Sequence, residues 1–136
     1  MTKKIVIDGD GAIFGRLCSF AAKKALEGNE IVIVNSEKTI ITGNKKNIIE
    51  EYSDVRKKGQ SHSLKGPKLS RITYKMLKRS IRGMLPNFRS GWGREAYKRI
   101  ICYDGIPENL RNEKMVKINT MAKLKYIELK ELSELI

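Results

Sequence analysis

The residues that could carry out acid–base or nucleophilic catalysis are few in this sequence. His62 is the only histidine, and it lies in a segment with almost no acidic residue to orient it as a general base. No Ser-His-Asp triad is available, because this one histidine would have to serve in a segment without an acid beside it. Glu50 and Glu51 are adjacent in a predicted helix, where side chains point about 100° apart and cannot share a proton or a metal ion. We expect a protein that is not an enzyme, with no catalytic residues and no metal site.

A glycine-rich turn is the strongest feature in favour of an enzyme. Residues Gly9–Gly15 read GDGAIFG between the first predicted strand and the first predicted helix, where a dinucleotide-binding loop would lie. The spacing is one residue longer than in the usual loop, and Glu37 is only loosely placed as the acid that would bind a ribose. A tight turn that needs glycine is the simpler interpretation. A small nucleotide-binding enzyme remains the second hypothesis, whereas the first expects no cofactor and no small-molecule substrate.

The two cysteines do not indicate a metal site or a disulfide framework. Cys18 and Cys102 lie far apart in different predicted elements, and the sequence has no C-x-x-C motif. We expect both to be small buried hydrophobic side chains.

The basic residues are concentrated in one third of the chain. The sequence has 28 Lys and Arg against 15 Asp and Glu, a net charge of +13. The segment 56–99 holds 14 of these bases and a single acid, Glu95, so the rest of the chain is neutral. Such an excess of like charge destabilises a compact protein unless an anionic partner neutralises it. The segment lacks the wide apolar face of a membrane-surface helix, so nucleic acid is the favoured partner over a membrane or a plain basic surface.

Two patterns within this segment favour RNA. Lys75, Lys78, Arg79 and Arg82 share one face of a predicted helix at a spacing that suits the phosphates of a backbone. Phe88, Trp92 and Tyr97 alternate with basic residues, and such aromatic side chains either pack in a core or stack on unpaired bases. A DNA-binding protein is less favoured, because no helix-turn-helix or zinc pattern is present. The candidate RNA-binding residues are Arg56, Lys57, Lys58, Lys65, Lys68, Arg71, Lys75, Lys78, Arg79, Arg82, Arg89, Trp92, Arg94, Lys98 and Arg99.

The elements that must position these residues follow from hydrophobic periodicity. Apolar residues recur at helical spacing in four segments and form short β-branched runs between them. The first strand, helix and second strand form a βαβ unit, whose strands should be parallel. The predicted strands are 4–8, 31–35, 39–42 and 100–103; the predicted helices are 14–26, 45–57, 73–85 and 94–99; and 126–136 should form a short strand and helix.

The predicted fold is a single three-layer α/β/α domain with a small, mostly parallel sheet, spanning residues 1–136. Hydrophobic residues make up 40% of the chain, enough for a core of this size. The loop 58–70 has few apolar residues, so we expect it to be disordered until RNA binds. The N-terminal apolar run is too short for a signal peptide, and no run approaches the ~18 apolar residues that cross a bilayer. We therefore expect a soluble protein that stays inside the cell.

Six short motifs in the sequence resemble one known family. In order along the chain they are GRL at 15–17, VNSEK at 34–38, TG at 42–43, RGMLP at 82–86, GREA at 93–96 and YDGIP at 103–107. Together they resemble the universal large-subunit ribosomal protein thirteen in its archaeal form, from the first strand to at least Pro107. The residues expected at structural turns are Gly15, Gly43, Gly83, Pro86, Gly105 and Pro107.

The resemblance implies a layered α/β/α protein that lies among segments of large-subunit ribosomal RNA. It implies a structural constituent of the large ribosomal subunit in the cytoplasm, one that binds and stabilises this RNA during assembly and in the mature ribosome and catalyses nothing. The implied partners are large-subunit ribosomal RNA and neighbouring ribosomal proteins. The motif around Arg79, Arg82 and Met84–Pro86 matches the family signature and lies in the basic segment.

Overall fold

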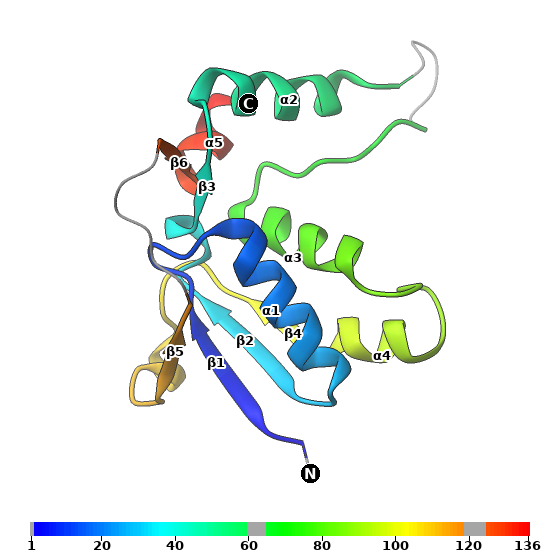
Figure 1. Ribbon diagram of the computed structural model, residues 1–136, viewed down its shortest axis with the longest axis vertical. Helices are drawn as coiled ribbons and strands as arrows, with labels where there is room; N and C mark the ends of the chain where they lie inside the picture. Colours follow the sequence, from blue (N-terminus) through cyan, green and yellow to red (C-terminus); the bar gives the residue numbers. More distant parts are fainter. Residues whose placement is uncertain (1, 60–64, 119–124) are drawn as a thin grey trace.

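The computed structural model describes residues 2–59, 65–118 and 125–136. Its centre is a sheet of four strands in the order β4-β2-β1-β5 (Figure 1), and every neighbouring pair is parallel. The strands are β1 (Lys4–Asp8), β2 (Glu30–Val34), β4 (Ile100–Cys102) and β5 (Met115–Lys117). The predicted α/β domain with a small, mostly parallel sheet is confirmed, as is the parallel pairing of β1 and β2.

Three helices cover one face of this sheet and enclose the main core. They are α1 (Phe14–Leu26), α3 (Thr73–Met84) and α4 (Gly91–Lys98). Alternate strand residues such as Ile7, Ile31 and Ile33 are fully buried against Leu17 and the small side chains that follow it in α1. This arrangement follows from the two periodicities in the sequence, because a strand shows every second residue to one face and a helix every third or fourth.

Fewer residues pack against the opposite face of the sheet. Val6, Val32 and Val34 are buried there against Leu110 from the short 3₁₀ turn η2 (Glu108–Leu110). The expected three-layer arrangement is therefore uneven in the described part of the chain. The helices lie on one face, and a loop with one 3₁₀ turn lies on the other.

A second, two-stranded sheet lies at one end of the molecule (Figure 1). It pairs β3 with β6 in antiparallel orientation. The elements at this end are η1 (Ser36–Lys38), β3 (Ile40–Thr42), α2 (Lys45–Lys57), β6 (Tyr126–Glu128) and α5 (Leu129–Leu135). Ile127, Leu129 and Leu132 are fully buried and join this end to the main core, which confirms the predicted closing strand and helix.

Several sequence predictions need correction. Gly15 lies inside α1 and Gly83 inside α3, each with open space where a side chain would extend, so neither forms a turn. Helix α4 begins at Gly91, three residues before the predicted start, and β5 was not predicted at all. Among the described residues, no helix is long and apolar enough to cross a membrane.

The other residues expected at turns lie between elements. Gly43 and Gly105 have φ angles of +133° and +69°, which favour glycine. Pro86 comes just after Leu85, the C-cap residue that follows α3, and Pro107 directly precedes η2. His62 and the middle of the loop predicted to be disordered (residues 60–64 of 58–70) fall outside the described residues.

Candidate nucleic-acid interface

Helix α3 presents an apolar face to the core and a basic face to the surface. Met76, Leu77 and Ile81 are buried in the core. Met84, the last residue of α3, is 45% exposed. The core contacts on one side leave the basic side chains of α3 on the other.

These basic side chains line a groove of about 390 Å³, which we call the α3 groove. It brings together the four predicted cations of α3 and one more from the preceding segment. Among the described residues that line it there is no acid. Its lining residues are Lys68, Ser70, Tyr74, Lys75, Lys78, Arg79, Arg82 and Tyr97. Five cations around one hollow attract an anion strongly, since their fields add where water is partly excluded.

Aromatic rings hold several of these cations in place. The Lys78 ammonium lies 4.8 Å from the ring centre of Tyr97, and the Arg82 guanidinium lies 4.6 Å from that of Phe88. Arg89 lies over the same Phe88 ring at 5.4 Å. Cation–π contacts of this kind limit the rotamers of long basic side chains, so less entropy is lost when a phosphate binds.

The basic surface continues along α3 beyond the groove. A second hollow of about 420 Å³ is lined by Arg79, Arg82 and Phe88 together with Ser80, Gly83 and Leu85. Because Arg79 and Arg82 line both hollows, the two form one continuous strip beside α3. Trp92 on α4 is 71% exposed, so its indole ring contributes little to the packing of the core. It is therefore open for stacking, whereas Phe88 and Tyr97 already pack within the protein.

Other candidate residues have partners within the chain. The Arg56 guanidinium donates to the Leu69 carbonyl at 2.9 Å and so ties the end of α2 to the segment before α3. The Arg99 guanidinium donates to the Ala25 carbonyl at 3.0 Å, at the end of α1, where the same carbonyl also accepts from the Gly28 amide at 3.1 Å. These two bonds give Arg56 and Arg99 a structural role.

The basic segment does not form a single surface. Arg71 lines a different hollow, together with Glu37, Asp104 and Glu134. Lys98 and Arg99 line another near the sheet edge, together with Glu30 and Glu95. Lys57, Lys58, Lys65, Arg89 and Arg94 are exposed outside the α3 groove. The fold therefore gathers only part of the predicted set into an acid-free site.

Sequence reasoning missed two members of the groove. Tyr74 is half-buried, packs against the core and also lines the groove. Ser70 precedes α3, and its hydroxyl accepts a hydrogen bond from the Ile72 amide at 3.1 Å. Its position three residues before the start of α3 is the signal in the sequence that could have placed it beside the helix.

The glycine-rich turn is built for packing. The amide of Gly9 donates to the Val34 carbonyl at 2.9 Å, and that of Gly11 to the Lys38 carbonyl at 3.2 Å. The Asp10 amide donates to the Asp8 carboxylate at 3.0 Å. A dinucleotide-binding loop needs such amides for phosphate oxygens, so their internal use argues against that function. A side chain at Gly9 would lie 3.0 Å from the Val34 carbonyl, which explains why glycine is required there.

Both cysteine thiols are buried in the core, as predicted. Burial raises the pKa of Cys102 from 9.0 to about 12, with a smaller opposing effect of Lys78 and a supporting one of Asp104. Burial also raises the pKa of Cys18, and Cys102 adds to this effect. The thiols are therefore neutral near pH 7 and poor nucleophiles.

Two of the motifs meet at the carboxyl ends of β2 and β4. Asn35 has a left-handed backbone (φ 55°), and its side-chain amide donates to the Asp8 carboxylate at 3.0 Å. The Glu37 carboxylate accepts from the Gly105 amide at 2.9 Å. The motifs VNSEK and YDGIP thus form one junction that holds η1 against the loop after β4.

Comparison with known proteins gives one consistent family. The family model described as ribosomal protein L13 matches residues 2–109. The large ribosomal subunit protein uL13 of Methanocaldococcus jannaschii is 47% identical over 133 residues, which cover 95% of this chain and 94% of that protein. The uL13 proteins of Archaeoglobus fulgidus (43% identical; 83% and 70% covered) and Picrophilus torridus (38% identical; 97% and 96% covered) are similar as well. Because both the family model and these relatives span most of the sequence, the chain belongs to the ribosomal protein L13 family, a family of structural, non-enzymatic proteins.

Proposed function

We propose that this protein binds large-subunit ribosomal RNA through the α3 groove and stabilises the folded RNA during assembly and in the mature ribosome. Membership of the family makes the chain a structural constituent of the large ribosomal subunit in the cytoplasm, with ribosomal RNA and neighbouring ribosomal proteins as partners. The RNA-binding surface itself is our proposal.

The observation that carries the proposal is the acid-free cluster of cations in the groove. Lys68 and the four basic residues of α3 converge there, while the net charge of the chain outside 56–99 is zero. Where RNA segments fold against one another, their phosphates repel, and a protein that supplies fixed cations lowers this repulsion. The arginines can also donate two parallel hydrogen bonds to one phosphate.

Further residues extend the proposed surface. Arg89 and Trp92 lie beyond the groove, where an exposed indole can stack on an unpaired base. We place Arg56 and Arg99 in supporting roles, since each guanidinium already binds a backbone carbonyl of the protein.

The test is a binding titration with large-subunit ribosomal RNA, with a DNA duplex of equal length as competitor. We expect tight RNA binding that resists the competitor and falls in the variant Lys75→Ala/Lys78→Ala/Arg79→Ala/Arg82→Ala. A variant with four exposed lysines changed to Ala elsewhere (Lys3, Lys23, Lys114 and Lys117) carries the same charge change and should bind nearly as well as the wild type. RNA and DNA bound alike, with equal losses in both variants, would contradict a specific site.

The nucleotide-binding enzyme gives an opposite prediction for the free protein. If Gly9–Gly15 held a dinucleotide, NAD would raise the thermal unfolding temperature, because a ligand that binds only the folded state stabilises it. We expect no shift with NAD and a clear shift with the RNA, measured by differential scanning fluorimetry.

A further inference from the structure

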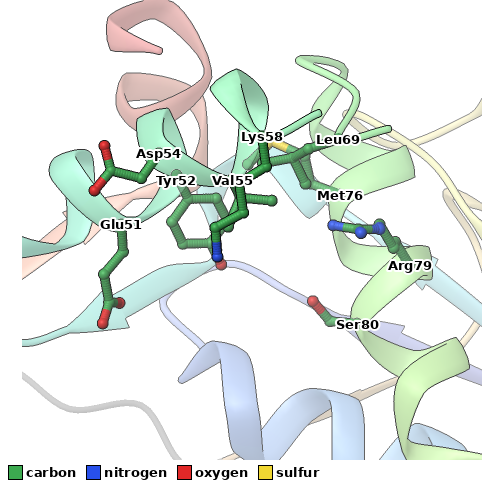
Figure 2. A pocket seen from close by; sticks show the side chains of 9 residues that line it. All are labelled: Glu51, Tyr52, Asp54, Val55, Lys58, Leu69, Met76, Arg79 and Ser80. Atoms are coloured by element: carbon green, nitrogen blue, oxygen red, sulfur yellow. The ribbon is translucent and has the colours of Figure 1, made fainter. Parts of the chain in front are cut away.

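A pocket between α2 and α3 lies outside the α3 groove. It has a volume of about 500 Å³, within the usual range of ~300–1,000 Å³ for small-molecule sites. Figure 2 shows Arg79 and Ser80 projecting from α3 on one side of it, with Glu51, Tyr52 and Asp54 from α2 on the other. Helix α2 makes only sparse contacts with the other described elements, so the space between the two helices is not closed by packing.

The pocket combines an apolar part with charged groups of both signs. Tyr52, Val55, Leu69 and Met76 supply the apolar part. Burial raises the pKa of the Tyr52 phenol, with further contributions from Cys18 and Glu51 and an opposing one from Arg79, so its ring carries a neutral hydroxyl. Arg79 and Lys58 are cations at the wall, and Ser80 adds a hydroxyl.

The two acidic side chains in the pocket wall are unusual for a surface that binds RNA. Glu51 and Asp54 are exposed, lie three residues apart on one face of α2, and line the pocket at the margin of the basic surface. Near an RNA backbone a carboxylate is unfavourable, because it repels phosphate. It becomes favourable where the RNA presents hydrogen-bond donors, and the paired N–H donors that match a carboxylate belong to the edges of the bases.

The position of Arg79 connects the pocket to the backbone path. Arg79 lines the pocket, the α3 groove and the second hollow beside Phe88. An RNA strand whose phosphates follow α3 therefore passes the mouth of the pocket at Arg79. A nucleotide at that point can place its phosphate on Arg79 and turn its base toward α2.

We propose that the pocket between α2 and α3 binds one unpaired base of the RNA, with Tyr52 and the apolar side chains against its ring and Glu51 or Asp54 accepting from its Watson–Crick edge. Guanine fits this wall best, since its two neighbouring N–H donors match the two oxygens of a carboxylate. The inference rests on the proposed function, because it assumes that RNA follows the α3 groove.

The test compares the RNA affinities of three variants, each with one exposed acidic residue of α2 changed to Ala. Glu51→Ala and Asp54→Ala remove pocket acceptors, and Glu50→Ala is the matched control, because Glu50 is exposed on α2 and does not line the pocket. We expect Glu51→Ala, Asp54→Ala or their combination to weaken RNA binding about 5- to 100-fold, the usual loss for a good base contact. Glu50→Ala should leave affinity unchanged or slightly raise it, because a negative charge near RNA is lost.

A simple charge effect predicts the opposite change in RNA affinity. If Glu51 and Asp54 are only solvated acids, or if the pocket takes a side chain of a neighbouring protein, then their removal leaves RNA binding unchanged or tighter, and the proposal is wrong. The variant Lys75→Ala/Lys78→Ala/Arg82→Ala, whose sites do not line the pocket, is measured in parallel. A loss in this variant without a loss in the α2 variants overturns the base pocket and leaves the proposed function intact.

Chemical probing identifies the base. Kethoxal modifies the Watson–Crick edge of unpaired guanine, so the wild-type protein should protect one guanine of the bound RNA. The same guanine should react again in the complex with Glu51→Ala/Asp54→Ala at saturating protein. Identical kethoxal patterns for both proteins would overturn the assignment.

Discussion

Gly83 and Gly93 both lie in helices, but their surroundings differ. A side chain at Gly83 would meet open space, whereas one at Gly93 would lie 2.4 Å from the Pro86 carbonyl oxygen and 2.6 Å from that of Asn87. Both oxygens belong to the backbone, so they cannot move aside as the end of a flexible side chain could. Gly93 is thus required for the close approach of α4 to the turn that follows α3.

The same alanine substitution should therefore have opposite effects at these two positions. Gly83→Ala should raise the free energy of unfolding by about 0.5–1 kcal/mol, because alanine has less backbone entropy to lose in a helix. Gly93→Ala should lower it by about 1–3 kcal/mol through the steric conflict. Urea denaturation measures both, and a destabilising Gly83→Ala or a neutral Gly93→Ala would contradict the described geometry.

The buried thiols predict an alkaline loss of stability. The pKa of Cys102 rises from 9.0 to about 12 on folding, and that of Cys18 rises too. The unfolded chain therefore loses these protons first as the pH rises, and stability falls between about pH 9 and pH 12. Below about pH 9 both states keep the thiol protons, so this contribution is complete there.

The measurement is the free energy of unfolding against pH for the wild type and for Cys18→Ala/Cys102→Ala. The wild type should fall more steeply above pH 9, by up to about 1.4 kcal/mol per pH unit for each thiol. The difference between the two slopes removes the contributions of lysine and tyrosine, which both proteins share. Parallel curves would show that the thiols ionise equally in the folded and unfolded states.

At the scale of elements, α2 is held by a few specific contacts. Ile48 is buried, the Lys45 ammonium pairs with the Glu131 carboxylate at 2.6 Å, and Arg56 binds the Leu69 carbonyl. The ion pair is exposed, so it stabilises little. The Arg56 bond thus fixes the spacing between α2 and the segment that leads into α3.

Arg56→Ala should loosen this segment without unfolding the protein. We expect faster amide hydrogen exchange in residues 65–70, because the hydrogen bond from Arg56 to the Leu69 carbonyl is lost. The exchange rates of the core helices should change little. Lys57→Ala is the matched control, since Lys57 is the exposed neighbour at the end of the same helix. Equal exchange rates in the two variants would show that Arg56 does not hold the segment.

Most elements were predictable because their apolar spacing is regular. Helices α1 and α2 lie where periodicity placed them, as do β1 and the closing β6–α5 unit. Strand β5 was missed because Met115–Lys117 is short and half-exposed and shows no alternation of apolar and polar residues. It is a strand because it pairs with β1 in the folded protein. The early start of α4 was missed because Gly91-Trp92-Gly93 has low helix propensity, which packing at Gly93 overrides.

At the scale of the whole molecule, the charge pattern gave the region of the candidate site but not its boundaries. The sequence identified the basic face of α3, because helical spacing alone brings those four cations together. It could not show that Arg71 lies near Glu37 and Asp104, or that Arg56 and Arg99 bind backbone carbonyls. These neighbours come from distant parts of the chain, so only the tertiary fold reveals them.

The most direct test of the central claim is the salt dependence of RNA binding. Each phosphate neutralised by a cation adds about 0.7–0.9 to the slope of log K against log salt concentration. The slope for Lys75→Ala/Lys78→Ala/Arg79→Ala/Arg82→Ala should be about three units shallower than that of the wild type. The variant with Lys3, Lys23, Lys114 and Lys117 changed to Ala should keep nearly the wild-type slope. Equal slopes for the two variants would contradict the claim that RNA phosphates bind in the α3 groove.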